Sequence, residues 1–318
     1  MKYIQLLILN TAFLFIAACS KPATEPVTIA INPWPGYEFL FLAEQKKFFQ
    51  QVGANIKLIQ LASLADAQRA YISGRVDGLA STLIEAVQAE ALGGKPIKIS
   101  LIADYSNGGD VIIANSSIEN MQALKGKTVG CEVSSLGIFI LQRALEKAGL
   151  SLNDVKVVNT EQMLGKQALA NQDIDAFVTY PPVSVDIQKL SGFHTIFSSA
   201  EIPFEIIDAI SIAADQIEKN PKLVPQLHQA WQMALDFSQS NPQEAYQIMS
   251  EREGISVVDF KDALKNLVLI DQPKQKKLFA KPDKIQKIAK TVCETLVKAQ
   301  SLSTDCSELS DIVHRGEI

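Results

Sequence analysis

Residues 27–38, VTIAINPWPGYE, decide the fold class of this chain. Val27–Ile31 is rich in β-branched residues and predicts a strand. Two prolines and a glycine follow, and they predict a stiff turn over residues 32–38. Apolar residues at helical spacing then run from Tyr37 to Gln51. The stretch therefore predicts a strand that enters a helix through a short loop.

The same strand–loop–helix pattern recurs in two series. The first series has predicted strands at 27–31, 56–60, 77–80 and 97–103 and helices at 37–51, 64–73 and 81–92. The second has strands at 111–114, 128–130, 155–158, 174–178 and 195–197 and helices at 135–148, 161–170 and 183–190. Such alternation predicts βαβ units and parallel sheets. We therefore expect an α/β fold with two similar lobes.

The last third of the chain is mostly helical. After one more predicted strand at 207–212, helical patterns occupy 217–238, 242–252, 257–268 and 281–299. We expect this helical region to pack back on the first lobe. Gly149 follows the predicted helix at 135–148 and fits a C-cap position.

The composition supports a large core and excludes several classes of protein. Hydrophobic residues make up 47% of the 318 residues and charged residues 20%, so most of the chain is not disordered. The 30 basic and 35 acidic residues give a net charge of −5. No basic patch dominates, so we expect no nucleic-acid partner.

The N-terminus has the pattern of an export signal. Residues 1–18 combine Lys2 with an apolar stretch that ends in small residues, as in a secretory signal peptide. Residues 16–19, IAAC, resemble the lipobox of bacterial lipoproteins, in which the chain is cut before the cysteine and the thiol is lipidated. We expect an exported protein that Cys19 anchors to the cell envelope, with residues 19–26 as a polar tether. The alternative is ordinary signal cleavage with an incidental Cys19.

The remaining cysteines allow at most one internal disulfide. Lipidation of Cys19 leaves Cys131, Cys293 and Cys306, which is an odd number. Cys293 and Cys306 are close in sequence and are the expected pair. Cys131 follows an apolar strand and is expected to be a small buried residue.

The chain lacks the common catalytic motifs. Neither G-x-S-x-G, nor G-x-x-x-x-G-K-[ST], nor H-E-x-x-H occurs in it. The three histidines, His194, His228 and His314, are scattered, and no two have the spacing that places metal ligands on one helix. We therefore expect a protein that is not an enzyme and that has no metal and no cofactor.

Aromatic side chains mark two candidate ligand-binding loops. In open α/β sheets, ligands bind beyond the carboxyl ends of the strands. Trp34 and Tyr37 follow the first strand, and Tyr180 lies between a predicted strand and two prolines. They would form an aromatic wall for a planar or apolar group. The alternative is that they cover the core of their own lobe.

Hydroxyl side chains mark two other loops. Ser81 and Thr82 begin one predicted helix, and Ser134 and Ser135 begin another. Free backbone N–H groups at such positions bind carboxylate or sulfonate groups. The alternative is simple N-capping, for which serine and threonine are preferred.

The order of several short motifs resembles a family of bacterial solute-binding proteins that serve ABC importers for nitrate, sulfonates, taurine and thiamine-precursor pyrimidines. The motifs are WPGY at 34–37, LA at 42–43, FF at 48–49, GRVDG at 74–78, LKGKTVG at 124–130, DIDA at 173–176 and NPQEA at 241–245. They cover nearly all of the chain beyond residue 26. The cysteine-rich motif of the pyrimidine-binding branch is absent, which counts against a thiamine-precursor ligand.

The resemblance implies a two-lobed type II periplasmic-binding-protein fold with a helical C-terminal region. Lobe 1 would comprise residues 27–110 and 208–318, and lobe 2 residues 111–207. The implied ligand-binding residues are Trp34, Gly36, Tyr37, Ser81, Thr82, Asp110, Ser134, Ser135, Tyr180 and Asp208. Asp110 and Asp208 would lie where the chain crosses between the lobes.

The loops that would line the cleft are acidic. Segments 32–38, 80–85, 104–110, 131–137, 179–184 and 204–209 contain no basic residue. Their acidic residues are Glu38, Glu85, Asp104, Asp110, Glu132, Glu205 and Asp208. An acidic cleft repels dianions and attracts amines, so this pattern favours a ligand with a cationic or amino group.

We therefore expect the substrate-binding lipoprotein of an ABC importer. It would capture a small organic solute that is amine-bearing, sulfonate-like or heteroaromatic, and deliver it as a monomer to an ABC permease in the inner membrane. One alternative is an enzyme of pyrimidine or thiamine-precursor metabolism on the same fold. Another is a ligand-sensing receptor for a membrane signalling partner.

Overall fold

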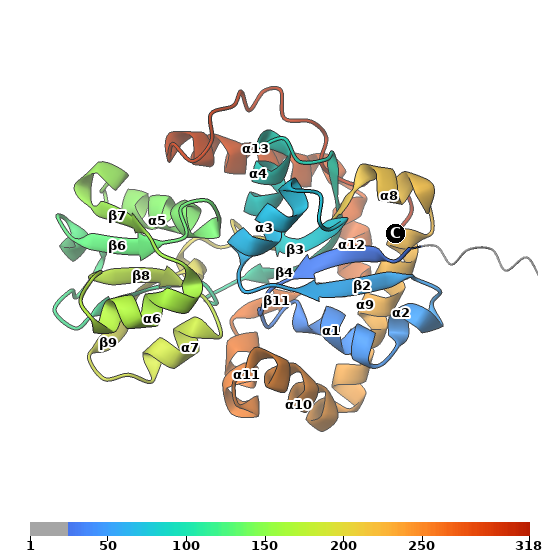
Figure 1. The fold of residues 1–318 in the computed structure, drawn as a ribbon, viewed down its shortest axis with the longest axis horizontal. Helices are drawn as coiled ribbons and strands as arrows, with labels where there is room; N and C mark the ends of the chain where they lie inside the picture. The colour runs from blue at the N-terminus through green and yellow to red at the C-terminus, as the bar shows by residue number, and fades with distance from the viewer. Residues whose placement is uncertain (1–24) are drawn as a thin grey trace, which may run out of the picture.

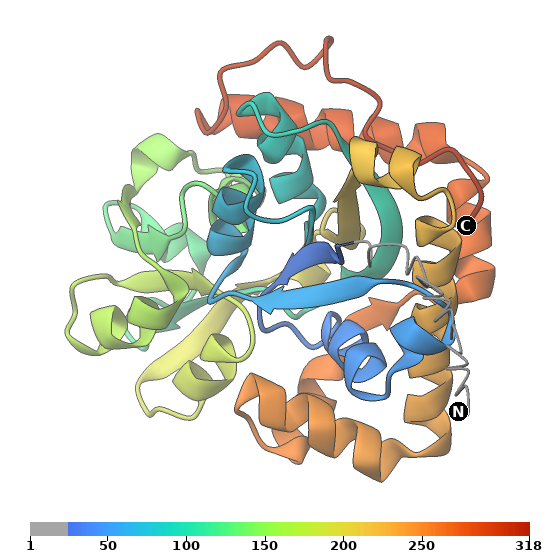
Figure 2. The same ribbon diagram turned by 45° about the vertical axis from the view of Figure 1, so that its right-hand side comes forward.

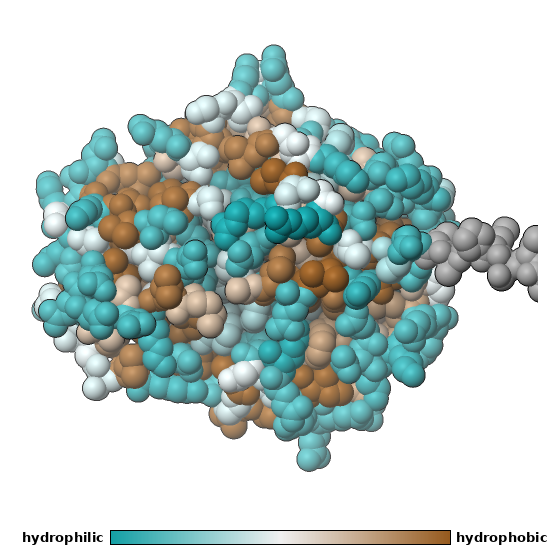
Figure 3. Space-filling model, viewed as in Figure 1, coloured by the Kyte–Doolittle hydropathy of each residue, from teal (hydrophilic) through white to brown (hydrophobic). Residues whose placement is uncertain are grey.

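The computed structural model describes residues 25–318 and is a mixed α/β structure with two sheets (Figure 1). The predicted signal peptide, the lipidation site at Cys19 and most of the tether lie outside the described residues. Within them, no helix has the length and apolar character needed to cross a bilayer. Apolar side chains form scattered patches among polar ones on the face shown in Figure 3.

The six-stranded sheet has the order β11–β4–β10–β3–β1–β2. Its strands are β1 (Val27–Ile31), β2 (Ile56–Gln60), β3 (Gly78–Thr82), β4 (Ile97–Ser106), β10 (Ile207–Ala213) and β11 (Leu267–Leu269). β1 pairs in parallel with β2 and β3, whereas β10 lies antiparallel between β3 and β4. The carboxyl ends of β1 and β3 therefore lie at the same edge of the sheet as the start of β10.

The five-stranded sheet has the order β7–β6–β8–β5–β9. Its strands are β5 (Val111–Asn115), β6 (Thr128–Cys131), β7 (Lys156–Asn159), β8 (Ala176–Thr179) and β9 (Phe193–Ser198), and its helices are α5 (Leu136–Lys147), α6 (Gln162–Ala170) and α7 (Val183–Gln188). We call this part of the molecule the five-stranded side. Gly149 has a φ of 72° and ends the turn after α5, which confirms the predicted C-cap.

The remaining helices surround the six-stranded sheet and form, with it, the six-stranded side. They are α1 (Glu38–Gln45), α2 (Phe48–Gln51), α3 (Leu64–Ile72), α4 (Leu83–Ala91), α8 (Ala214–Lys219), α9 (Leu223–Ser240), α10 (Pro242–Glu253), α11 (Val257–Leu264), α12 (Gln272–Phe279) and α13 (Pro282–Lys298). Figure 2 shows the long α9 along this side and α13 across its top. The helical C-terminal region thus packs back on the first sheet, as predicted. A disulfide joins Cys293 to Cys306, which confirms the expected pair, and Cys131 is buried and free.

The chain passes between the two sheets at residues 107–110 and again at 202–206. The chain next to the two passages is connected, because Ser106 Oγ at the end of β4 lies 2.8 Å from Ser199 Oγ and the backbone N–H of Gly108 donates to Ser199 Oγ at 2.7 Å. One apolar core cluster spans both sheets, with Ile29 of β1 and Val129 of β6 among its members. The two sides therefore pack against each other. The predicted lobe boundaries at 110/111 and 207/208 stay a prediction about how the molecule moves.

Three predicted helices were wrong in extent. The helix at 37–51 breaks at Lys47, whose φ of 58° is left-handed. The helix at 217–238 breaks at Asn220, since the following Pro221 disfavours a helical backbone there. The pattern at 257–268 ends at Leu264, because the next residues pair with β4 as strand β11. Helix α12 was not predicted.

Candidate functional site

The turn after β1 brings Trp34 against a buried carboxylate. The backbone N–H of Tyr37 donates to the Trp34 carbonyl at 2.9 Å and closes the turn. Trp34 Nε1 donates to Asp104 Oδ2 at 3.3 Å. Gly36 allows this approach, because a Cβ at that position would lie 1.9 Å from Asp104 Oδ2. The glycine predicted in the binding loop therefore makes room for an aspartate.

Asp104 and Asp208 lie side by side on neighbouring strands. They are partners in the β4–β10 ladder, and burial, followed by the negative charge of Asp104, raises the pKa of Asp208. The Tyr37 hydroxyl donates to Asp208 Oδ1 at 2.5 Å. The predicted residues Trp34, Tyr37 and Asp208 therefore meet around Asp104.

The three predicted aromatic residues come together from both sides of the molecule. The rings of Trp34 and Tyr180 meet edge to face, with their centroids 6.1 Å apart, and those of Trp34 and Tyr37 lie 6.4 Å apart. Tyr180 follows β8 on the five-stranded side, and its Oη accepts a hydrogen bond from the backbone N–H of Leu64 at 3.3 Å. The aromatic wall thus crosses the boundary between the two sides instead of covering one core.

Three carboxylates in this region are buried without enough partners. The unpartnered oxygens are Asp104 Oδ1, both carboxylate oxygens of Asp110, and Asp208 Oδ2. Each of these side chains is at most 2% exposed. Burial raises the pKa of Asp104 and of Asp110 to about 7, and neighbouring negative charge adds to both shifts. Burial, together with the charges of Asp104 and Asp110, raises the pKa of Asp208 well above its ordinary range.

We call Asp104, Asp110 and Asp208 the carboxylate cluster. No basic group contributes to the pKa shift of any of the three. Unpaired buried carboxylates are costly and are stabilised by a proton or by a cation. The cluster is therefore suited chemically to hold a positively charged group.

Hydroxyl groups of the two predicted serine and threonine loops form hydrogen bonds within the protein. Thr82 caps α4, because its Oγ1 accepts from the backbone N–H of Ile84 at 3.1 Å, and Ser81 Oγ donates to the Thr82 carbonyl at 3.0 Å. Ser135 is buried and donates to Glu85 Oε1 at 2.7 Å, whereas Ser134 is exposed. For Thr82, the N-capping alternative therefore describes the structure.

Asp104 and Glu85 were not among the predicted ligand-binding residues. The sequence signal that could have found them is the excess of acidic residues in the predicted cleft loops. Two other acidic residues of those loops have basic partners: Glu38 pairs with Arg252, and Glu205 accepts from Arg143 at 2.7 Å. Only the packing of the folded chain determines which acidic residues have a basic partner and which have none.

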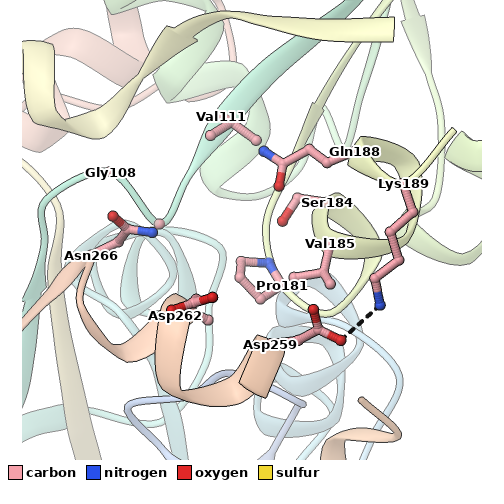
Figure 4. A pocket seen from close by; sticks show the side chains of 12 residues that line it. Gly108, Val111, Pro181, Ser184, Val185, Gln188, Lys189, Asp259, Asp262 and Asn266 are labelled. Atoms are coloured by element: carbon pink, nitrogen blue, oxygen red, sulfur yellow. Dashed lines mark hydrogen bonds and ion pairs between the residues drawn. The ribbon is translucent and has the colours of Figure 1, made fainter. Parts of the chain in front are cut away.

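A separate cavity of about 250 Å³ lies at the first crossing (Figure 4). It is lined on one wall by α7 and on the other by α11, with Gly108 and Gly109 between them. Lys189, directly after α7, and Asp259 of α11 form an ion pair of 2.7 Å across it. This cavity adjoins Asp110 through the crossing segment but contains none of the three clustered carboxylates in its lining.

No group of three or more histidine, cysteine and acidic side chains among residues 25–318 is arranged to hold a metal ion. Two residues that could carry out reactive chemistry are buried in the core. His228 is one of them, and its Nε2 lies 2.7 Å from the Ser100 carbonyl oxygen. Burial raises the pKa of the Cys131 thiol to about 12, so it is not a thiolate at neutral pH.

Curated relatives are distant in sequence. A Haemophilus influenzae protein whose name assigns it to thiamine biosynthesis is 24% identical over 230 residues, which is 71% of this chain and 73% of that one. A Brucella abortus protein named as a binding protein is 27% identical over 173 residues, so this chain spans about half of its length. A 4-amino-5-hydroxymethyl-2-methylpyrimidine phosphate synthase of Saccharomyces cerevisiae is 23% identical over 260 residues, 77% of this chain and 74% of that one.

Solved structures share the fold. The periplasmic aliphatic sulphonate-binding protein SsuA of Escherichia coli matches with a TM-score of 0.73 at 15% identity, over 91% of this chain and 96% of that one. The periplasmic nitrate-binding protein NrtA of Synechocystis matches with a TM-score of 0.72 at 14% identity, over 91% and 86%. The fold is therefore that of the periplasmic binding proteins, as the sequence predicted.

A family model for NMT1/THI5-like proteins matches residues 34–245, a range that includes the aromatic wall and the carboxylate cluster. That range begins at Trp34 and covers most of both sheets. The chain belongs to the NMT1/THI5-like family.

Proposed function

We propose that this chain is the substrate-binding component of an ABC importer, and that it captures a small amine-bearing solute between two lobes. One observation carries the proposal: three buried carboxylates with unpartnered oxygens lie beside an aromatic group drawn from both sides of the molecule. The similarity to periplasmic binding proteins for sulphonate and nitrate supports the transport role. We further propose that the receptor works as a monomer and delivers the solute to a permease in the inner membrane.

The proposed recognition follows from simple chemistry. An ammonium group has three donors and no acceptor, and the carboxylate cluster has four unpartnered acceptor oxygens. A cation also binds well against the faces of Trp34, Tyr37 and Tyr180. An amino-substituted heteroaromatic ring would use both features, with the ring against the aromatic wall and the amino group at the carboxylates.

Calorimetry on purified variants tests the amine. A thermal-shift screen over amines, amino acids, pyrimidines and sulfonates first supplies the solute. We expect Trp34→Ala to weaken binding by about 1–3 kcal/mol and Asp208→Asn by about 2–5 kcal/mol, because the latter removes a desolvated charge partner. Asp173→Asn, at an exposed position, is the control and should bind like the wild type.

The outcomes separate the possible solutes. Loss of affinity with Trp34→Ala alone would favour a neutral or anionic planar solute and would overturn the amine. Wild-type affinity in both folded variants would mean that the solute binds elsewhere in the molecule.

We also propose that the protein is exported and anchored through Cys19. The lipobox-like residues 16–19 are the support for this anchor. Cys19→Ala should release the protein from membranes or block its processing. Unchanged membrane association together with an unchanged mature mass would refute the anchor.

The enzyme alternative has one observation in its favour, the similarity to the yeast pyrimidine phosphate synthase. The buried Cys131 thiol and the internally bonded His228 count against reactive chemistry in this chain. Mass spectrometry of the solute after long incubation with the protein tests it, and an unchanged solute supports the receptor. A neighbouring permease gene, as opposed to a receptor-kinase gene, would favour an importer over a sensor.

A further inference from the structure

Two helix N-termini face the boundary between the two sides of the molecule. α5 begins on the five-stranded side, and α3 begins on the six-stranded side. The first N–H groups of a helix have no partner within the helix and attract negative charge. In both cases the partner is a side chain from the opposite side of the molecule.

At the start of α5, the partner is Glu85. This residue belongs to α4 on the six-stranded side, and its Oε1 accepts from Ser135 Oγ and from the backbone N–H of Leu136, both at 2.7 Å. Its Oε2 accepts from the backbone N–H and the hydroxyl of Thr82, at 2.9 and 2.6 Å. Four donors therefore surround one buried carboxylate, and the chain supplies its own anion to this helix.

At the start of α3, the arrangement is reciprocal. Tyr180 Oη accepts from the backbone N–H of Leu64 at 3.3 Å. Ser63 caps α3 by accepting from the backbone N–H of Asp66 at 3.3 Å. Both helix starts at the boundary are thus occupied by groups of this chain.

We propose that Glu85 determines specificity by filling the anion-binding position at the start of α5, and that it thereby excludes anionic solutes from the site. The inference rests on the proposed function and narrows its solute to a neutral or cationic molecule. A sulfonate or carboxylate would have to displace Glu85 Oε1 from the two donors at the start of α5, the Ser135 hydroxyl and the backbone N–H of Leu136. It would then lie near the carboxylate cluster, where like charges repel.

Charge balance gives the proposal a second support. Burial raises the pKa of Glu85, and its hydrogen bonds with Thr82, Ser135 and Leu136 act in the opposite direction. A carboxylate held by four donors is therefore compensated where it lies, whereas an anion added at the start of α5 would find the two donors of that helix start in use. A cationic solute needs none of these donors.

Chemical rescue tests the position of the anion. Glu85→Ala leaves a space the size of a carboxymethyl group, so acetate should occupy it. We expect sodium acetate to raise the melting temperature of Glu85→Ala well above its value in sodium chloride at equal ionic strength. The wild type and Glu85→Gln should show no such difference, because their side chains fill the position.

A control separates this effect from a general response to charge. Glu161→Ala removes an exposed glutamate at the start of α6, which lies on the same side as α5. It should not respond to acetate. A folded Glu85→Ala, checked by circular dichroism, that shows no acetate-specific shift would overturn the proposal.

Solute selectivity is tested with methanesulfonate. Glu85→Ala should bind it at least about tenfold more tightly than the wild type, the size of a favourable helix-terminus interaction. Tight binding of methanesulfonate by the wild type would also overturn the proposal. Neither measurement uses an amine, so a failed amine screen would refute the proposed solute without affecting this result.

Discussion

At the scale of the residue, Asp110 shows a conflict between stability and binding. Both of its carboxylate oxygens are buried and unpartnered, and burial raises its pKa from 3.8 to about 7. A neutral side chain at this buried position would cost less stability than the Asp110 carboxyl group does. Such a group is costly in the free protein and useful only when a cation meets it.

Asp110→Asn should therefore stabilise the free protein at high pH. With a raised folded pKa, the stabilising contribution of the proton is fully present below pH 3.8 and is lost as the pH rises through about 7. Above that pH the variant should gain roughly 2–4 kcal/mol over the wild type, while its affinity for an amine falls. Melting curves from pH 4 to 9 measure the first effect. Equal pH profiles for the two proteins would contradict the burial of an unpaired acid.

Gly36→Ala should disturb the same site by steric conflict. Its Cβ would lie 1.9 Å from Asp104 Oδ2, so either the loop or the aspartate must move. We expect a loss of stability of about 1–3 kcal/mol, which is typical of overpacking. Denaturant unfolding measures it. In the double variant with Asp104→Ala the penalty should shrink, and equal penalties in both backgrounds would disprove the clash.

At the scale of the element, α7 and α11 hold the two sides together at the cavity of Figure 4. The ion pair between Lys189 and Asp259 is partly exposed, so its contribution is small. It nevertheless connects helices that belong to different sheets. Its effect should therefore appear in how far the molecule opens more than in how stable it is.

Lys189→Ala should favour the open form of the free protein. We expect a slightly larger radius of gyration by small-angle scattering and a stability loss of at most about 1 kcal/mol. Lys166→Ala is a matched control, because Lys166 pairs with Asp186 within the five-stranded side at 3.6 Å. If both variants scatter alike, the ion pair does not affect opening.

At the scale of the whole molecule, the two sides are in contact through a shared apolar core. The core cluster is continuous across both sheets, and Gly108 of the first crossing segment donates to Ser199, which lies just before the second crossing segment at 202–206. We expect the two crossing segments to act as a hinge, about which each sheet would rotate with its helices.

The free protein should therefore open in solution and close on the solute. Small-angle scattering should show a smaller radius of gyration at saturating solute than without it. The charge of the free carboxylate cluster favours opening, so the change should be larger at pH 8 than at pH 5. An unchanged radius at saturation would mean that the sides do not move as lobes.

Local patterns in the sequence determined most of the fold. The strands at 27–31 and 56–60 were predicted to the residue, because β-branched runs between turn signals are strong local signals. Local patterns also located the aromatic residues and the acidic loops. Local patterns missed the helix breaks at Lys47 and Asn220, because the backbone conformation at those residues decides them. They also missed the short strand β11, because it forms by pairing with the distant strand β4.

Only the tertiary structure decided what the polar residues do. The sequence cannot distinguish Glu38, which pairs with Arg252, from Asp110, which has no partner, because the difference lies in what packs against each carboxylate. It suggested an anion site at Ser134–Ser135, whereas the folded chain brings Glu85 to that helix across the boundary. Local sequence sets the propensity of a segment, but charge compensation depends on contacts between residues far apart in the chain, and only the fold makes those contacts.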